Sequence, residues 1–362
     1  MQDFQALPAA MQAADRDAVL RVLASGHYVL GKEVAAFEAE WAAACGSAAA
    51  VGVGNGMDAI EISLRAIGIG PGDEVVTTAM TACATVLAIV RAGAVPVLAD
   101  IDPGTGLLDR DSVARCLSTR TRALLLVHLY GQMRDVQGWQ AFTEQAGIVL
   151  LEDCAQAHLA REGDRVAGTF GPLGAYSFYP TKNLGAAGDG GAIIGSDPAA
   201  IDACRVLRDY GQRGKYHHVV AGLNSRLDEM QAAILRARLP WLQSLNQRRR
   251  DIATRYRERL SNPLVRLLEP PLAPENHVHH LFVVRCERRD ELAAHLRTLG
   301  VDSAVHYPVP MHRQEACRGA RIDPEGLPAT EAHARTCLSL PCHPFLDDAS
   351  VEAVVAAVDA FR

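Results

Sequence analysis

The sequence predicts an α/β protein with a large domain, built on a mainly parallel β-sheet between helices, and a smaller C-terminal α/β domain. Short apolar runs alternate with amphipathic stretches in the first half of the chain, which is the pattern of successive strand–helix units. The 362 residues are enough for two domains. A proline-rich stretch at 263–274 is the weakest part of the chain. We therefore expect a large domain over residues 1–245, N-terminal helices included, and a small domain over residues 246–362.

The large domain is expected to begin with two helices, at residues 9–25 and 33–44, where apolar residues recur at helical spacing. Short apolar runs then predict strands at residues 48–53, 73–78, 95–99, 123–129, 148–151, 173–178 and 191–195. Helical stretches lie between most of these strands, from about residue 56 to 67 and at residues 82–92, 111–117 and 136–146. This alternation favours parallel pairing.

Residues 228–260 predict one long helix or a helix pair that is broken near Pro240. The basic run Arg248–Arg250 lies in this segment, and we expect it on a solvated helix face. After the proline-rich loop, residues 280–285 predict a strand and residues 287–299 a helix.

Composition excludes several classes of protein. The net charge is −6 and charged residues are 22% of the chain, which argues against nucleic acid or an anionic membrane as a partner. The nine cysteines are irregularly spaced without a Cys-x-x-Cys pair. This argues against a disulfide framework or a structural zinc site and suits a reducing cytoplasm. Met1–Gln5 lack the basic start of a signal peptide, and no apolar run reaches membrane-spanning length.

Lys182 is the first candidate for chemistry. It follows the apolar run 173–179 and Pro180, and glycines occupy positions 185, 188, 190 and 191. Glycine allows a ligand to approach the backbone closely, and lysine amines form Schiff bases with carbonyl substrates and with pyridoxal 5'-phosphate (PLP). The alternative is a solvated lysine in a turn.

An acidic residue and an amide follow the strand predicted at 148–151. Asp153 lies at its carboxyl end, where open α/β sheets bind ligands. PLP needs a carboxylate against its ring nitrogen, and Gln156 could donate a hydrogen bond to the ring hydroxylate. Glu152 should point the opposite way from the strand, and His158 is expected to be structural.

Three further segments could bind a phosphate group. Gly56 and Met57 open a helix after a strand, where free backbone amides bind anions. Ser177 offers a hydroxyl before Lys182, and Asn224 and Arg226 could bind a phosphate or a carboxylate. The alternatives are a simple strand–helix turn, a buried serine and helix-capping residues. Together with Lys182 and Asp153, these signals converge on PLP.

The chain resembles the DegT/DnrJ/EryC1/StrS family of nucleotide-sugar aminotransferases, which are fold-type-I PLP enzymes. The resemblance covers nearly the whole chain. It lies in residues 26–31, 37–38, 51–59, 70–75, 128–132, 152–158, 177–192 and 224–233.

The resemblance implies a role for each matched residue. Lys182 would bind PLP covalently and act as the catalytic base, with pyridoxamine 5'-phosphate as the intermediate form of the cofactor. Asp153 would partner the ring nitrogen and Gln156 the ring hydroxyl. The phosphate would be held by Gly56, Met57, Ser177 and, from the neighbouring subunit of a homodimer, Asn224. Arg226 is a candidate for binding the carboxylate of the amino donor.

The implied reaction moves an amino group from L-glutamate to a keto-deoxysugar linked to a nucleoside diphosphate, with dTDP expected. Tyr179 and the glycine-rich loop after Lys182 resemble the branch that acts on 3-keto sugars. The alternative is the same reaction at C4 of a 4-keto sugar.

Other substrate contacts are expected from two segments. Residues 211–218 resemble a mobile loop in which Arg213, Lys215, His217 and His218 could meet the diphosphate, or could simply be solvated. His306, Tyr307 and His312 belong to a segment that lines the sugar pocket in the family. The chain departs from the family at Ala82, where an aromatic residue often packs on the cofactor ring, so the sequence names no residue for that face.

Rival interpretations are weaker. A sugar dehydratase of the same superfamily replaces the lysine with histidine, whereas this chain has Lys182. A non-catalytic binding protein would not need both Lys182 and Asp153. A dinucleotide-binding protein is disfavoured because glycines 52, 54 and 56 do not have the Gly-x-Gly-x-x-Gly spacing. Cys154 is expected to be a small buried filler, and His277, His279 and His280 lack companion metal ligands, so no metal site is expected.

Overall fold

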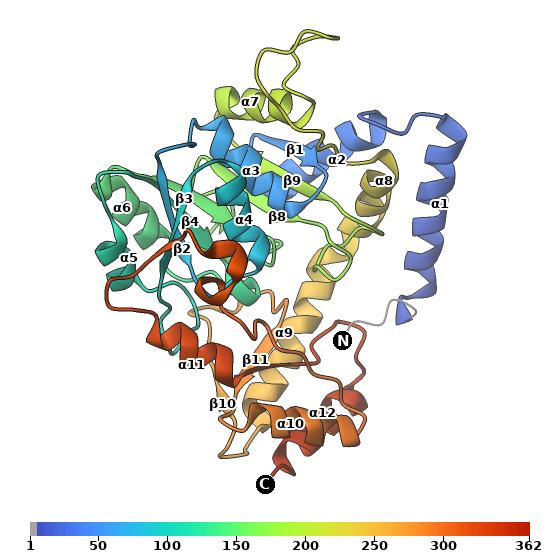
Figure 1. Cartoon of the computed structure of the whole chain (residues 1–362). Helices are drawn as coiled ribbons and strands as arrows, with labels where there is room; N and C mark the ends of the chain where they lie inside the picture. The colour runs from blue at the N-terminus through green and yellow to red at the C-terminus, as the bar shows by residue number, and fades with distance from the viewer. Residues whose placement is uncertain (1–5) are drawn as a thin grey trace.

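The computed structural model of the protein describes residues 6–362. The expectation that no signal peptide is present rests partly on Met1–Gln5, which lie outside the described residues. An upper lobe contains a large central sheet, and a smaller lobe lies below it (Figure 1). Between residues 6 and 362, no helix has both the length and the apolar composition that crossing a membrane requires.

The large sheet has eight strands and is mainly parallel, as the sequence predicts. All neighbouring pairs from β8 to β12 are parallel, and β9 is antiparallel to both β8 and β1. In spatial order the strands are β1 (Ala49–Val53), β9 (Gly191–Gly195), β8 (Leu173–Ser177), β5 (Val149–Asp153), β4 (Thr121–Val127), β2 (Glu74–Thr78), β3 (Val95–Ala99) and β12 (Arg321–Ile322).

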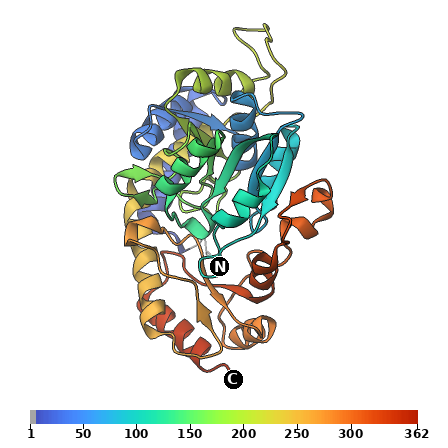
Figure 2. The ribbon, with the colours of Figure 1, turned by 90° about the vertical axis from the view of Figure 1, so that its left-hand side faces the viewer.

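Helices cover both faces of this sheet (Figure 2). Successive strand residues enter opposite cores, because side chains alternate across a strand: Val75 and Leu125 face one core, and Val76 and Leu124 face the other. The first core also contains α3 (Gly56–Ala66), α4 (Cys83–Arg91) and α7 (Pro198–Arg208). The second contains α2 (Lys32–Cys45), α5 (Arg110–Cys116), α6 (Val136–Ala146) and α8 (Glu229–Arg238). The N-terminal α1 (Ala9–Ser25) packs against α8.

The smaller lobe has its own core around a three-stranded antiparallel sheet. Its strands are β10 (Arg266–Leu267), β11 (Phe282–Arg285) and β13 (Cys337–Leu340). Its helices are α10 (Arg289–Thr298), α11 (Pro328–Thr336) and α12 (Asp348–Asp359). A short hairpin of β6 (Arg161–Glu162) and β7 (Arg165–Val166) lies outside both sheets.

The two lobes are joined by α9 (Leu242–Arg259), which follows a short 3-10 turn at Leu239–Trp241 that contains Pro240. Leu242 belongs to a core of the large sheet and Tyr256 to the core of the smaller lobe. Strand β12 returns from the C-terminal part of the chain to pair with β3. The division at residue 245, which stays a proposal, falls within α9.

Most of the predicted elements are confirmed, with limits shifted by a few residues. The strand predicted from residue 280 begins at Phe282. The segment that contains Asn224 is not a helix start: Asn224 forms an antiparallel bridge with Asp209, and α8 begins at Glu229. The N-cap residue Asp228 makes no side-chain capping bond, so the capping explanation for this segment is wrong.

The expectation of a solvated basic face on α9 is wrong for Arg249, which is only 3% exposed. Arg249 falls on the same helical stripe as four other buried residues. These are Leu242, Asn246, Ala253 and Tyr256. Their spacing of three and four residues is the pattern of one helix face, so Arg249 is turned into the protein between the two lobes.

Candidate active site

Lys182 and Asp153 lie at the carboxyl ends of neighbouring strands. Asp153 is the last residue of β5, and it pairs in register with Ala175 of β8. After β8 ends at Ser177, a turn carries Lys182, whose backbone N–H donates to the carbonyl oxygen of Tyr179 at 2.8 Å. Burial of the Lys182 amine lowers its pKa to about 8, and the negative charge of Asp153 opposes this shift. The two charges are therefore close enough to interact.

The Asp153 carboxylate is buried and held by two donors. Its Oδ2 accepts a hydrogen bond from the Thr85 hydroxyl at 2.8 Å, and its Oδ1 accepts one from the Ala155 N–H at 3.1 Å. The Thr85 and Thr81 hydroxyl oxygens lie 2.8 Å apart. Because Thr85 uses its only proton on Asp153, Thr81 donates to Thr85. The two donors hold the carboxylate in one orientation. The sequence does not predict the role of Thr85, because no motif in α4 distinguishes its hydroxyl from other hydroxyl groups.

Gln156 connects the region around Asp153 to the smaller lobe. Its Oε1 accepts from the Tyr130 N–H at 2.6 Å, which fixes Nε2 as the donor to the Tyr307 hydroxyl at 3.2 Å. Burial raises the pKa of Tyr307 to about 12, the Gln156 hydrogen bond opposes the shift, and the Asp153 charge adds to it. The structure thus brings Tyr307, expected at a sugar pocket, to the group formed by Asp153 and Gln156.

The N-terminus of α3 forms an anion cradle next to Ser177. The Asn55 side chain caps the helix by accepting from the Asp58 N–H at 2.9 Å. The first intrahelical bond starts at the Ala59 N–H, so the amides of Gly56 and Met57 precede it and are suited to an anion. A Cβ on Gly56 would lie 2.6 Å from the Cβ of Ser177. Only glycine allows this close approach.

Asn224 lies beside the same helix end. It is exposed, while its neighbour Ser225 donates to Asp58 at 2.7 Å and accepts from the Gly54 N–H at 3.0 Å. Arg226 forms an ion pair with Asp209 at 3.0 Å. The roles of Asn224 toward a neighbouring subunit's phosphate and of Arg226 toward a donor carboxylate stay predictions.

The segment after α7, which contains the four residues expected at a diphosphate, extends away from the body of the chain (Figure 1). Arg213 pairs with Asp202 at 2.5 Å, and Lys215 lies 5.2 Å from the centre of the Tyr216 ring. His217 and His218 are exposed. Within one chain, this segment is therefore not brought to Lys182.

The remaining substrate candidates differ in their surroundings. Tyr179 is 53% exposed. His306 bonds through Nδ1 to the Ser339 hydroxyl at 2.9 Å, and burial followed by the Lys182 charge lowers its pKa. His312 instead bonds through Nε2 to Glu331 at 2.7 Å. His306 thus lies near Lys182, whereas His312 is engaged with Glu331.

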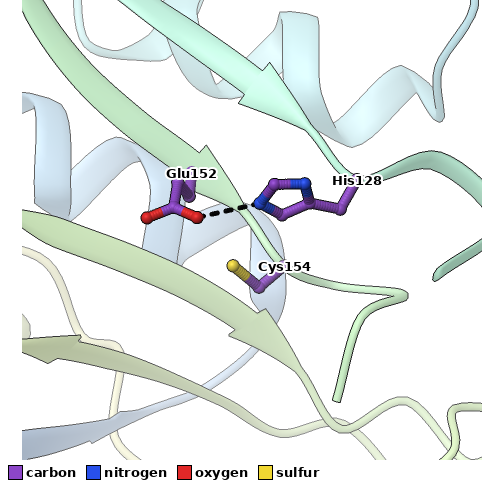
Figure 3. Close-up of side chains that lie close together, drawn as sticks. All are labelled: His128, Glu152 and Cys154. Atoms are coloured by element: carbon purple, nitrogen blue, oxygen red, sulfur yellow. Dashed lines mark hydrogen bonds and ion pairs between the residues drawn. The ribbon is translucent and has the colours of Figure 1, made fainter. Parts of the chain in front are cut away.

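A buried cluster of His128, Glu152 and Cys154 has the ligand types of a metal site (Figure 3). Glu152, however, already accepts four hydrogen bonds. They come from His128 Nε2 at 2.9 Å and from the backbone N–H groups of Gly168 at 2.8 Å, Phe170 at 2.7 Å and Gly171 at 3.1 Å. Burial raises the pKa of Cys154. Glu152 thus points away from Asp153 and fixes the turn that leads into β8, so these groups do not fit a metal ion.

The residues around Lys182 and Asp153 do fit PLP. A buried amine of lowered pKa suits a covalent link to its aldehyde. A buried carboxylate with two donors suits a protonated ring nitrogen. The free amides of α3 and the Ser177 hydroxyl suit its phosphate.

Comparison with known proteins decides the family. A sequence model of the DegT/DnrJ/EryC1/StrS aminotransferase family matches residues 9–359. The chain belongs to this family. It is 46% identical over 359 residues to dTDP-3-amino-3,4,6-trideoxy-alpha-D-glucose transaminase of Streptomyces venezuelae, covering 98% of this chain and 94% of that enzyme. The predicted class, a PLP-dependent aminotransferase, is confirmed.

Two further similarities extend over the whole chain. The aminotransferase is 40% identical over 360 residues to dTDP-3-amino-3,6-dideoxy-alpha-D-galactopyranose transaminase of Aneurinibacillus thermoaerophilus, covering 99% of this chain and 98% of that enzyme. The solved structure of DesV of S. venezuelae, in complex with a ketimine intermediate, matches with a TM-score of 0.94 at 45% identity, covering 99% of this chain and 96% of that one. The α/β architecture predicted from the sequence is therefore that of the family.

The lowered pKa of Lys182 in the aminotransferase is testable in the cofactor-free protein. Burial disfavours the ammonium form, so the amine should become reactive as the pH rises through about 8 instead of through 10.5. We expect trace acetylation of Lys182, quantified by mass spectrometry from pH 6 to 11, to reach half its maximum near pH 8. The chain unfolded in urea is the control and should give a midpoint near 10.5. Equal midpoints in the two states would contradict the buried setting.

The Thr85 hydroxyl should support cofactor binding. Thr85→Val keeps the shape of the side chain but removes the donor to Asp153. A hydrogen bond to a charged group contributes about 1.5–3 kcal/mol, so we expect the Kd for PLP to rise at least about tenfold. Thr81→Val, one hydroxyl further from Asp153, should have a smaller effect. A Thr85→Val protein that binds PLP as tightly as the unmodified chain would show that Thr85 does not act on the cofactor.

Proposed function

We propose that this aminotransferase transfers an amino group from L-glutamate, through PLP, to C3 of a 3-keto deoxysugar linked to a nucleoside diphosphate, with dTDP as the nucleotide. The observation that carries the proposal is the charge interaction between the buried Lys182 amine, in the turn after β8, and the buried Asp153 carboxylate at the end of the neighbouring strand β5. Both are needed for transamination, and neither is needed for sugar binding alone.

When bound, PLP supplies an electron sink for the pair of electrons released at the donor's α-carbon. Lys182 Nζ takes up the α-proton and later returns a proton to the sugar carbon. Its pKa of about 8 leaves more free amine near neutral pH than an ordinary lysine has. Asp153, held in position by the Thr85 hydroxyl and the Ala155 N–H, would partner the ring nitrogen.

Other residues position the cofactor. The second Nε2 hydrogen of Gln156 is available for the ring hydroxyl, since its Oε1 is fixed by Tyr130 and its first hydrogen by Tyr307. Phosphate binding is assigned to the Gly56 and Met57 amides, the Ser177 hydroxyl and Asn224 of a neighbouring subunit.

Two relatives support amination at C3 over C4. Both names describe transaminases that form dTDP-linked 3-amino sugars. The sugar is assigned to the region of Tyr179, His306 and Tyr307, with His312 at its margin, and the diphosphate to Arg213, Lys215, His217 and His218. Because the last four lie away from Lys182 in one chain, they would act across a subunit boundary.

A homodimer is part of the proposal. Large apolar side chains are exposed on α1, on the connection that follows it and on the segment after α7. They include Leu20, Leu23, Tyr28, Tyr210, Tyr216 and Val220. Burying such side chains against a second copy is favourable. The nine cysteines are all free thiols, which supports the proposed cytoplasmic location.

The proposal predicts a covalent cofactor at one lysine and a preference for 3-keto sugars. Borohydride reduction of the PLP-loaded protein should fix the label on Lys182, as located by peptide mass spectrometry. With L-glutamate as donor, a panel of 3-keto and 4-keto dTDP-sugars should give product from the 3-keto members. Lys182→Ala should lower the rate by at least about 10³-fold, because the general base is lost. Label at another residue, or product from 4-keto sugars alone, would refute it.

A further inference from the structure

Arg249 is a buried cation without a carboxylate partner. The residue is 3% exposed, and none of the ion pairs between residues 6 and 362 includes it. Charges are rarely buried unless they are paired or bound, because removing an ion from water is unfavourable. Burial also lowers the pKa of Arg249 to about 10. No carboxylate of the described residues forms an ion pair that offsets this burial.

Backbone carbonyls satisfy only part of the guanidinium. Its Nη1 donates to the carbonyl oxygens of Cys342 at 2.8 Å and of His279 and His280 at 3.3 Å. Its Nε is buried without an acceptor. Its Nη2 takes part in no hydrogen bond of the described part of the chain. Two of the three nitrogens of the fork, Nε and Nη2, therefore have no acceptor among the described residues.

A cavity of about 340 Å³ lies beside Arg249, and we call it the Arg249 cavity. Its lining is mainly apolar but includes the polar side chains of Thr181, His280, Ser303, His306 and Ser339. Asp302 is the acidic residue of the lining; it is exposed and forms no ion pair with Arg249. The lining thus offers donors and a positive charge to an incoming anion.

The Arg249 cavity lies next to Lys182, the proposed catalytic lysine. Thr181, in its lining, precedes Lys182, and a second, narrower cavity is lined by both Lys182 and Arg249. The positive charge of Lys182 also helps to lower the pKa of His280 and His306, after burial. A ligand in this cavity would therefore lie close to Lys182.

A carboxylate is the group that matches these features. A guanidinium presents planar, parallel N–H donors that bind the two oxygens of a carboxylate. Arg226, the candidate that the sequence suggests for this task, already has Asp209 as a partner at 3.0 Å. Arg249 has none among residues 6–362.

We propose that the Arg249 cavity binds a carboxylate group of the amino donor, with the Arg249 guanidinium as its counter-ion. The identity of the donor rests on the proposed function. The binding of a dicarboxylate to Arg249 can be tested without turnover.

The first experiment measures binding of glutarate, a dicarboxylate that lacks an amino group, to the PLP-loaded enzyme by calorimetry. Arg249→Met should weaken glutarate binding at least tenfold. Arg248→Met is the matched control: it removes the same charge from the adjacent residue, which pairs with Asp348 at 2.9 Å and does not line the cavity. It should leave glutarate binding within twofold. A wild-type enzyme that binds no glutarate, or an Arg249→Met enzyme that binds it normally, would overturn the proposal.

The second experiment separates the two substrates by steady-state kinetics. Arg249→Met should raise the KM for L-glutamate at least tenfold and leave the KM for the keto sugar within twofold. Equal increases in both values would indicate a structural role and would overturn the proposal. If Arg249→Met does not fold, Ser303→Leu fills the cavity while keeping Arg249, and it should show the same selective loss. An unmodified enzyme that aminates no keto sugar would instead refute the proposed function.

Discussion

The charge interaction between a buried lysine amine and a buried carboxylate is the constraint on which the rest of this structure depends. Asp153 ends β5 and Lys182 lies in the turn that follows the neighbouring parallel strand β8, so both residues lie at the same carboxyl edge of the sheet. Burial favours the neutral amine, whereas Asp153 favours the ammonium form, and the result is a pKa of about 8. This balance gives a lysine that can both form a Schiff base and move a proton near neutral pH.

The surrounding fold keeps this pair in place from three sides. Thr85 and the Ala155 N–H hold the Asp153 carboxylate. Glu152, one residue earlier and on the opposite face of β5, binds three backbone N–H groups of the turn before β8. The smaller lobe closes the third side through the hydrogen bond between Tyr307 and Gln156. The relative position of the two lobes therefore bears directly on the proposed cofactor site.

The sequence predicts the local parts of this arrangement and misses the parts made by distant contacts. Lys182 and Asp153 are recognisable because the strand, the turn and the polar residue are contiguous in the chain. Thr85 is not recognisable from the sequence, because its hydrogen-bond partner Asp153 lies 68 positions away.

Strand β12 is also not predicted from the sequence, because it is only two residues long and adds to a sheet formed by much earlier residues. The run of three arginines predicts a solvated Arg249, although its spacing from Leu242 and Tyr256 places it on the buried stripe of α9. Tyr307 was expected at a sugar pocket, and its bond to Gln156 depends on how the lobes meet.

A crystal structure of the protein with PLP is the most direct test of the central claim. The account predicts continuous density from Lys182 Nζ to the cofactor, with an Asp153 carboxylate oxygen about 2.7–2.9 Å from the ring nitrogen, the distance of a charge-assisted hydrogen bond. Density that joins the cofactor to another residue would contradict the account. So would a ring nitrogen that lies beyond hydrogen-bond distance of Asp153.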